Sequence, residues 1–196
     1  MKASFALTFL AILLASVFAA PTASLQKRTT TLFPNYLIPL KQSTPNTAYP
    51  TQYTATILYN GDDSTGNEQR TIVGFDIPGN NEHNCTISFV LPAPVLGGYP
   101  HAVNGSGRLE VYGFNGQVIN GVTNWNNRPP RYPLTPLWTI VQPTNFGPAT
   151  VTGSPLPCNH GERMDFEVVA TKGAGPTYFD WFELTTPKTG ITLDTW

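Results

Sequence analysis

Prolines and glycines interrupt this chain at short intervals, and they limit what it can fold into. The 196 residues include 19 prolines and 17 glycines, and both residue types weaken or break helices. Between them, no apolar stripe with helical spacing extends over a useful length. The intervening runs are short and rich in Val, Ile, Thr, Tyr, Phe and Trp, the residues favoured in strands. The sequence therefore predicts an all-β chain.

The clearest strand lies at residues 85–91, where the odd positions are apolar and two of the three even positions are polar. This alternation is typical of a strand with one buried face. Further strand-like runs lie at 33–41, 53–59, 71–77, 109–114, 122–125, 138–141, 149–151, 164–170, 178–185 and 190–193. Of these eleven runs we expect nine or ten to form strands, without crossover helices, and hence an antiparallel, jelly-roll-like β-sandwich.

Cys85 and Cys158 are the only two cysteines. In an oxidising compartment two cysteines most simply form a disulfide, and we expect it to pin the strand at 85–91 to a distant partner across the core. A bridge over 73 positions stabilises a fold by roughly 4 kcal/mol. His83 and His160 stand two positions from the cysteines, so a zinc site of two thiolates and two imidazoles is the alternative. We predict the disulfide and no metal.

The N-terminal residues predict the compartment. An apolar run follows Lys2 and ends near Ala19 with the small residues of a signal-peptidase site, so residues 1–19 read as a signal peptide. The run is too short for a membrane-spanning helix, which needs about 20 apolar residues. The dibasic pair at 27–28 predicts a propeptide at 20–28, which leaves 29–196 as one domain.

Secretion is also consistent with the sequons at Asn84 and Asn104, which predict N-glycosylation. The location we expect is extracellular or at the cell wall.

The charge of the chain limits its partners. The predicted mature domain, residues 29–196, holds eight basic residues against 12 acidic ones, a formal charge of −4. The basic residues are not clustered along the sequence, which argues against nucleic acid and membranes as partners. We expect a monomer whose partner is an extracellular polysaccharide or a protein.

The stretch 124–130 carries the candidate glycan-binding residues. An exposed indole at Trp125 could stack on a sugar ring, while Asn126, Asn127 and Arg128 could donate hydrogen bonds to its hydroxyls. The alternative is a turn set by the following prolines and anchored by a buried Trp125.

No pattern supports catalysis. A glycosidase needs two carboxylates that face each other across a cleft. Asp165 and Glu167 share one strand face and are expected to point to solvent, whereas Asp180 and Glu183 have opposite parity and face different sides. No Gly-x-Ser-x-Gly motif is present. We predict a non-catalytic protein without a cofactor, with a polysaccharide-active hydrolase or lyase as the alternative.

Several short motifs occur in a recognisable order. They include Phe-Pro-Asn-Tyr-Leu-Ile-Pro-Leu at 33–40, Phe-Asp-Ile-Pro at 75–78, the strand 85–92 and Tyr-Phe-Asp-Trp at 178–181. This order resembles the fungal secreted family named ubiquitin 3 binding protein C-terminal domain, over nearly all of the chain after residue 28. The resemblance implies a β-sandwich, no catalytic residues, and binding to a ubiquitin-like activating enzyme.

A weaker similarity to carbohydrate-binding jelly rolls rests on residues 122–129 and 180–184. Together these observations predict a secreted fungal β-sandwich that associates with cell-wall or other extracellular glycans. The alternative function is a protein-interaction module, either a structural wall protein or an effector.

Overall fold

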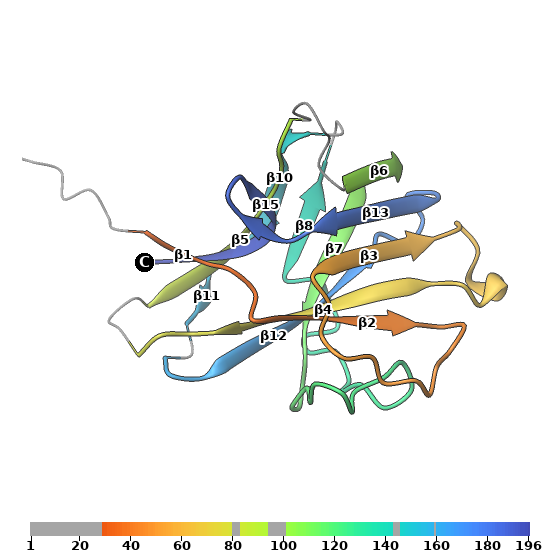
Figure 1. The fold of residues 1–196 in the computed structure, drawn as a ribbon, viewed down its shortest axis with the longest axis horizontal. Helices are drawn as coiled ribbons and strands as arrows, with labels where there is room; N and C mark the ends of the chain where they lie inside the picture. The colour runs from red at the N-terminus through yellow and green to blue at the C-terminus, as the bar shows by residue number, and fades with distance from the viewer. Residues whose placement is uncertain (1–28, 80–82, 94–100, 143–145, 159) are drawn as a thin grey trace, which may run out of the picture.

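The computed structural model describes residues 29–79, 83–93, 101–142, 146–158 and 160–196. In this part of the chain two antiparallel sheets pack face to face as a sandwich (Figure 1). The predicted fold class is therefore confirmed. Within the same ranges, no helix has the length and apolar character needed to cross a membrane.

The smaller sheet has six strands, with the strand predicted at 85–91 near its centre. Its order is β1 (Thr30–Leu32), β15 (Lys188–Thr195), β5 (Asn84–Leu91) and β11 (Leu156–Pro157). The short strands β14 (Leu184–Thr185) and β9 (Gly147–Pro148) pair with β15 and β5 respectively.

The larger sheet has nine strands. Its order is β10 (Thr150–Gly153), β8 (Trp138–Val141), β7 (Arg108–Gly113), β12 (Arg163–Ala170), β4 (Gln69–Asp76), β3 (Thr54–Tyr59), β13 (Thr177–Phe182) and β6 (His101–Gly105). The ninth strand, β2 (Tyr36–Lys41), also pairs with β4. A single 3₁₀ turn, η1 (Asp63–Thr65), lies between β3 and β4.

The inner faces of both sheets supply the main core. Along β5 every second side chain is buried, as the alternation predicted. Phe89 from the smaller sheet meets Trp181 from the larger sheet edge to face, with ring centroids 5.1 Å apart. Such aromatic contacts add to the burial of a large apolar area, so the two sheets are joined mainly by this face-to-face packing.

The disulfide between Cys85 and Cys158 is present, with the two Cα atoms 5.4 Å apart. Its expected place across the core is wrong. Cys158 directly follows β11, and β11 pairs with β5 so that Leu156 is opposite Cys85. The bridge therefore joins neighbours in one sheet, which spacing along the chain could not distinguish from a bridge across the core.

The described residues contain fifteen strands rather than nine or ten. Three of the additional strands are only two residues long, and the run at 178–185 divides into β13 and β14. The strand expected at 122–125 is absent, because Thr123 N–H donates to the carbonyl of Ile119 (2.8 Å) and closes a turn. Asn120 and Gly121 start this turn, and Gly121 has the positive φ (76°) that favours glycine.

Candidate functional site

The outer face of the nine-stranded sheet is covered by residues 114–137, which connect β7 to β8 and are called the covering loop below. Val118 of this loop is buried, and Phe114 and Trp125 are partly buried. They pack on a small apolar cluster of the sheet, consisting of Tyr36, Ile38, Leu40 and Ile72. The sheet therefore has a second, smaller core on the side where the alternation predicted solvent.

Glu167 lies in the middle of this covered face and is completely buried. The expectation that it points to solvent is wrong, although its position opposite to the core-facing Phe166 and Val168 is as expected. Asp165, also expected in solvent, is partly buried and accepts a hydrogen bond from the Tyr36 hydroxyl. Burial raises the pKa of Asp165 and outweighs the hydrogen bond from Tyr36. The covering loop is the reason for both differences, because it excludes water from the outer face.

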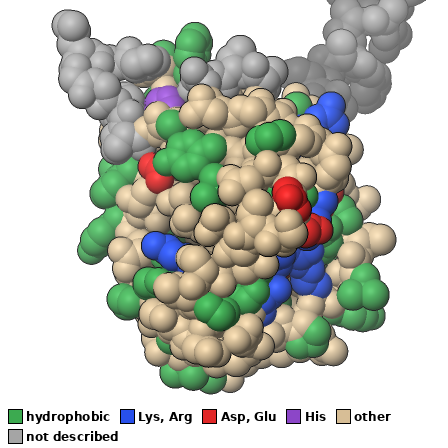
Figure 2. All heavy atoms as spheres, turned by 90° about the vertical axis from the view of Figure 1, so that its right-hand side faces the viewer, with side chains coloured by type: hydrophobic (Ala, Val, Ile, Leu, Met, Phe, Trp, Pro, Cys, Tyr) green, Lys and Arg blue, Asp and Glu red, His purple; other side chains and the backbone are tan. Residues whose placement is uncertain are grey.

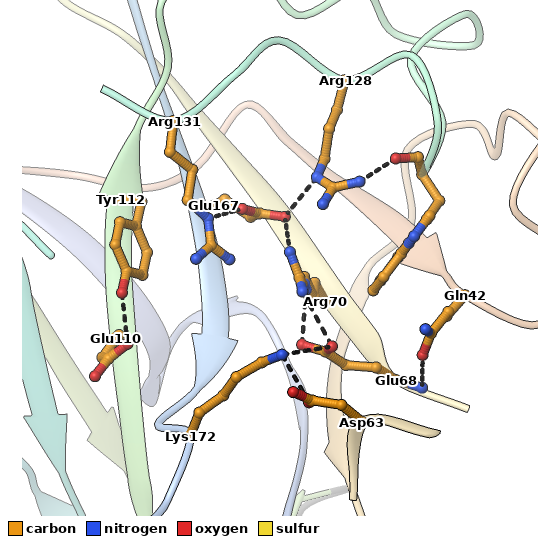
Figure 3. A network of polar contacts seen from close by, with 11 residues as sticks. Gln42, Asp63, Glu68, Arg70, Glu110, Tyr112, Arg128, Arg131, Glu167 and Lys172 are labelled. Atoms are coloured by element: carbon orange, nitrogen blue, oxygen red, sulfur yellow. Dashed lines mark hydrogen bonds and ion pairs between the residues drawn. The ribbon is translucent and has the colours of Figure 1, made fainter. Parts of the chain in front are cut away.

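Three arginines converge on the Glu167 carboxylate (Figure 3). Arg70 from β4 and Arg128 from the covering loop approach Oε1 at 3.2 Å and 3.1 Å, and Arg131 approaches Oε2 at 2.6 Å. On its other side Arg70 donates two hydrogen bonds to Glu68, at 2.7 Å and 3.0 Å. This geometry links the covering loop to the sheet through charge-assisted hydrogen bonds.

The electrostatics of the cluster favour the charged forms of Glu167 and Arg70 but disfavour that of Arg128, and positive charge is in excess. Burial alone would raise the pKa of Glu167, yet Arg70, Arg131 and Arg128 outweigh it, so the pKa lies below its usual value. Burial, together with repulsion by Arg70 and Arg131, lowers the pKa of Arg128 despite the attraction of Glu167. Lys172 joins the network through Glu68 and Asp63, so four cationic groups face three carboxylates. The one excess positive charge means that the cluster can accommodate a further anion.

A groove of about 440 Å³ opens beside these arginines. It is lined by Arg70, Arg128 and Arg131 together with Asn126, Leu134 and the two intervening prolines, and we call it the arginine groove. The Nη2 atom of Arg131 is buried and has no hydrogen-bond partner among the described residues. Figure 2 shows basic side chains grouped in a recess beside acidic ones on this side of the molecule.

The structure gathers the predicted glycan-binding residues in one turn. Trp125 is half-buried, and the guanidinium carbons of Arg70 and Arg128 lie 4.4 Å and 4.8 Å from its ring centroid. Asn126 and Asn127 are exposed, but their side-chain amides donate to Asn46 and Val122 respectively. Each of these side chains therefore has a structural partner, and their contact with a glycan stays a prediction.

A larger hollow of about 880 Å³ lies beside the same covering loop. Three carboxyl groups line it, those of Asp76, Glu162 and Asp165. Asp76 pairs with Arg163 at 2.9 Å, whereas Asp165 carries the raised pKa described above. The hydrolase alternative requires two carboxyl groups in one cleft whose surroundings give them different pKa values.

The histidines that stand two positions from the cysteines come together in the structure. The rings of His83 and His160 meet edge to face with centroids 5.4 Å apart. Because both sulfurs are in the disulfide, the zinc alternative with two thiolates is wrong. In the described part of the chain, no group of three or more His, Cys, Asp and Glu residues is placed to hold a metal ion.

The two sequons differ in accessibility. Asn104 is exposed near the end of β6, whereas Asn84 is partly buried at the start of β5. Glycosylation of either residue stays a prediction.

Sequence reasoning did not identify Arg70 and Arg131 as site residues. Arg131 follows Arg128 by three positions with two prolines between them, and prolines fix the backbone of such a segment, so the pair could have been noticed. Arg70 has no comparable local signal, because only the pairing of β4 with β12 brings it to Glu167.

A family model described as the ubiquitin 3 binding protein But2 C-terminal domain matches residues 32–187. The similarity suggested by the short motifs is thus confirmed. No curated protein matches the sequence. The matched residues include most of both sheets, the whole covering loop and the arginine groove.

Proposed function

This chain belongs to the family of the ubiquitin 3 binding protein But2 C-terminal domain, and on that premise we propose that it binds an acidic segment of a protein partner in the arginine groove. The family's name describes a protein that binds another protein, which points to a protein-interaction module. The observation that carries the proposal is the convergence of Arg70, Arg128 and Arg131 on one open groove. Arginine is the side chain best suited to bidentate contact with carboxylates.

The binding we propose is local rather than driven by overall charge. The predicted mature domain has a formal charge of −4, so it does not attract acidic partners over long distances. Within the groove, a carboxylate of the partner would offset the excess guanidinium charge and give Arg131 Nη2 a hydrogen-bond acceptor. The preference for an acidic segment should therefore depend on a few close contacts with the arginines, and it should weaken as salt is added.

A second candidate function is association with an acidic polysaccharide at the same groove. Asn126 and Arg128, two of the predicted glycan-binding residues, line the groove, and uronic acids would present carboxylates to the same guanidinium groups. This candidate keeps the expected association with extracellular glycans but adds a requirement for negative charge.

We also propose that the protein is secreted by a fungus, is not an enzyme and acts outside the cell. The apolar N-terminal run and the disulfide support secretion, because disulfides persist in oxidising compartments. Mass spectrometry of the protein from culture medium should find Thr29 at its N-terminus.

Fluorescence anisotropy of labelled probes tests the groove. The probes are a Glu-rich peptide, a Gln-rich peptide of equal length, an oligogalacturonate and ubiquitin. We expect the Glu-rich peptide to bind and Arg128→Gln to weaken it about tenfold, a loss of about 1.4 kcal/mol. Arg163→Gln is the matched control, because Arg163 lies outside the groove and its side chain is 43% exposed.

Circular dichroism must show that both variants remain folded. Equal affinities of the two variants would contradict the proposal, and a preference for oligogalacturonate over the peptide would favour the second candidate. Release of reducing sugar from the polysaccharide would contradict the non-catalytic role and direct attention to Asp165 in the larger hollow.

A further inference from the structure

A third pocket shares no lining residue with the arginine groove and lies where the β1–β2 connection passes the start of β3 and the junction of β13 and β14. Its volume is about 340 Å³, within the lower range of small-molecule sites. The described residues that line it include no lysine or arginine. Its polar side chains are Asn35, Thr51, Gln52, Glu183 and Thr185, together with the hydroxyl groups of Tyr36 and Tyr53.

Glu183 is held rigidly at this pocket. Its Oε2 atom accepts hydrogen bonds from Trp181 Nε1 at 2.9 Å and from the backbone N–H of Ile191 at 3.3 Å. Gly190 makes this approach feasible, because a Cβ atom at that position would collide with Oε2 and the indole. The other oxygen, Oε1, is buried and has no hydrogen-bond partner among the described residues. A buried polar atom without a partner is unusual in a folded protein.

The environment of Glu183 favours the protonated form. Burial raises the pKa of this carboxyl to about 8, and the hydrogen bonds from Trp181 and Ile191 and the charge of Lys188 lower it only in part. At neutral pH the group is then a neutral acid that can donate a hydrogen bond as well as accept one.

An exposed aromatic side chain borders the same pocket. Tyr53 is 78% exposed, and its ring stacks on Phe182 with centroids 6.0 Å apart and an interplanar angle of 18°. The backbone N–H of Glu183 donates to the carbonyl of Tyr53 at 2.9 Å. The aromatic ring and the neutral acid are therefore fixed next to each other by the backbone.

We propose that this pocket is a binding site for a neutral sugar residue, which stacks on Tyr53 and accepts a hydrogen bond from Glu183. An exposed ring next to amide, hydroxyl and carboxyl groups suits a ligand with an apolar face and several hydroxyls. A charged sugar suits it less well, because no cationic side chain among the described residues lines the pocket to pair with a carboxylate or sulfate.

This site is independent of the function proposed above. The arginine groove is cationic and should select acidic ligands, whereas this pocket should select neutral ones. Either site can fail without the other, because Arg128 and Glu183 line different pockets.

Isothermal titration calorimetry with the full mature chain tests the inference. The probes are neutral oligosaccharides of chitin, cellulose, β-1,3-glucan and mannan, with oligogalacturonate as the charged comparison. We expect at least one neutral probe to bind, and Tyr53→Ala to weaken it about tenfold. Tyr132→Ala is the matched control, because Tyr132 is 68% exposed but lies outside this pocket.

Substitutions at Glu183 separate a role in binding from a role in folding. Glu183→Gln keeps a hydrogen-bond donor and should bind within about threefold of the unmodified protein at pH 6, whereas Glu183→Leu should lose binding. Raising the pH from 6 to 9 should weaken binding by the unmodified protein but not by Glu183→Gln. All variants are compared by thermal unfolding.

Two results would overturn the proposal: no neutral probe binds the folded protein, or Tyr53→Ala binds as well as Tyr132→Ala.

Discussion

Glu167 and Glu183 are two buried carboxyl groups in one sandwich. Their surroundings favour the ionised form of Glu167 and the neutral, protonated form of Glu183. Glu167 lies under the covering loop with three arginines, which hold its pKa below the usual value against the effect of burial. Glu183 lies beside the main core with two neutral N–H donors, and burial raises its pKa to about 8. The difference shows that burial alone does not determine the charge of a side chain.

The physical reason is the cost of removing a charge from water. A buried carboxylate stays ionised only if nearby cations and hydrogen bonds replace its hydration; otherwise it takes up a proton. The covering loop brings Arg128 and Arg131 to Glu167, so the outer face can bury a charge. Around Glu183 the one cation that acts on the pKa, Lys188, has only a minor effect.

The strongest test of the comparison is Glu167→Gln. Removal of one partner from a buried ionic network leaves the other charges uncompensated. We therefore expect the free energy of unfolding to fall by about 3–5 kcal/mol at pH 7. Urea unfolding followed by tryptophan fluorescence measures the change. The exposed Glu162→Gln is the control and should change stability by less than about 0.5 kcal/mol. A decrease of less than about 1 kcal/mol in the free energy of unfolding of Glu167→Gln would mean that the arginines do not need the Glu167 carboxylate to compensate their charge.

The second test uses pH. Because the pKa of Glu183 is raised from about 4.5 to about 8 on folding, the native state keeps a proton that the unfolded chain releases in this window. Stability from this group is therefore complete below pH 4.5 and is lost as the pH rises to 8. Each unit of pKa difference corresponds to about 1.4 kcal/mol.

Glu183→Gln should remove this pH dependence. The free energy of unfolding of the variant, relative to that of the unmodified protein, should therefore rise by about 2–4 kcal/mol between pH 5 and pH 9. Glu167 has the opposite sign, since its lowered pKa gives stability above pH 4.5 that is lost on acidification. Parallel pH profiles for the two glutamine variants would contradict the comparison.

The smallest expected change in stability distinguishes a buried ion pair from an exposed ion pair. Arg131→Gln removes a 2.6 Å contact to the fully buried Glu167 carboxylate and should cost about 1.5–3 kcal/mol, because hydrogen bonds to charged groups are stronger than neutral ones. Arg163→Gln removes an exposed pair with Asp76 and should cost no more than about 1 kcal/mol. Thermal unfolding in low and high salt measures both, and equal losses would show that the covering loop does not shield Glu167.

Much of the fold could be predicted because the information is local. Alternation placed Ile87 and Phe89 in the core, and they are buried. The only two cysteines indicated one bridge, and the structure contains it. The same reasoning failed for residues 122–125, where the apolar Val122 and Trp125 suggested a strand but the backbone bonds of Thr123 close a turn.

The candidate site could be predicted only in part. Four residues, Trp125, Asn126, Asn127 and Arg128, were identified from one short stretch. Two of the four, Asn126 and Arg128, line the arginine groove. The sequence predicted only that Glu183 faces the side opposite to Asp180, and it gave no sign that the Glu183 carboxyl is isolated from charge. Arg70 is 97 positions from the Glu167 that it contacts, and nothing local connects them.

The sequence by itself determined the secondary-structure class, the alternating faces of the strands and the single disulfide, because these depend on neighbouring residues or on counting cysteines. Only the tertiary structure decided which polar face is covered. Period-two alternation shows that Asp165 and Glu167 point away from the main core, but it cannot show whether water or another segment lies there. The covering loop, placed by contacts between residues distant in sequence, turned a predicted solvent face into a buried ionic cluster beside an open groove.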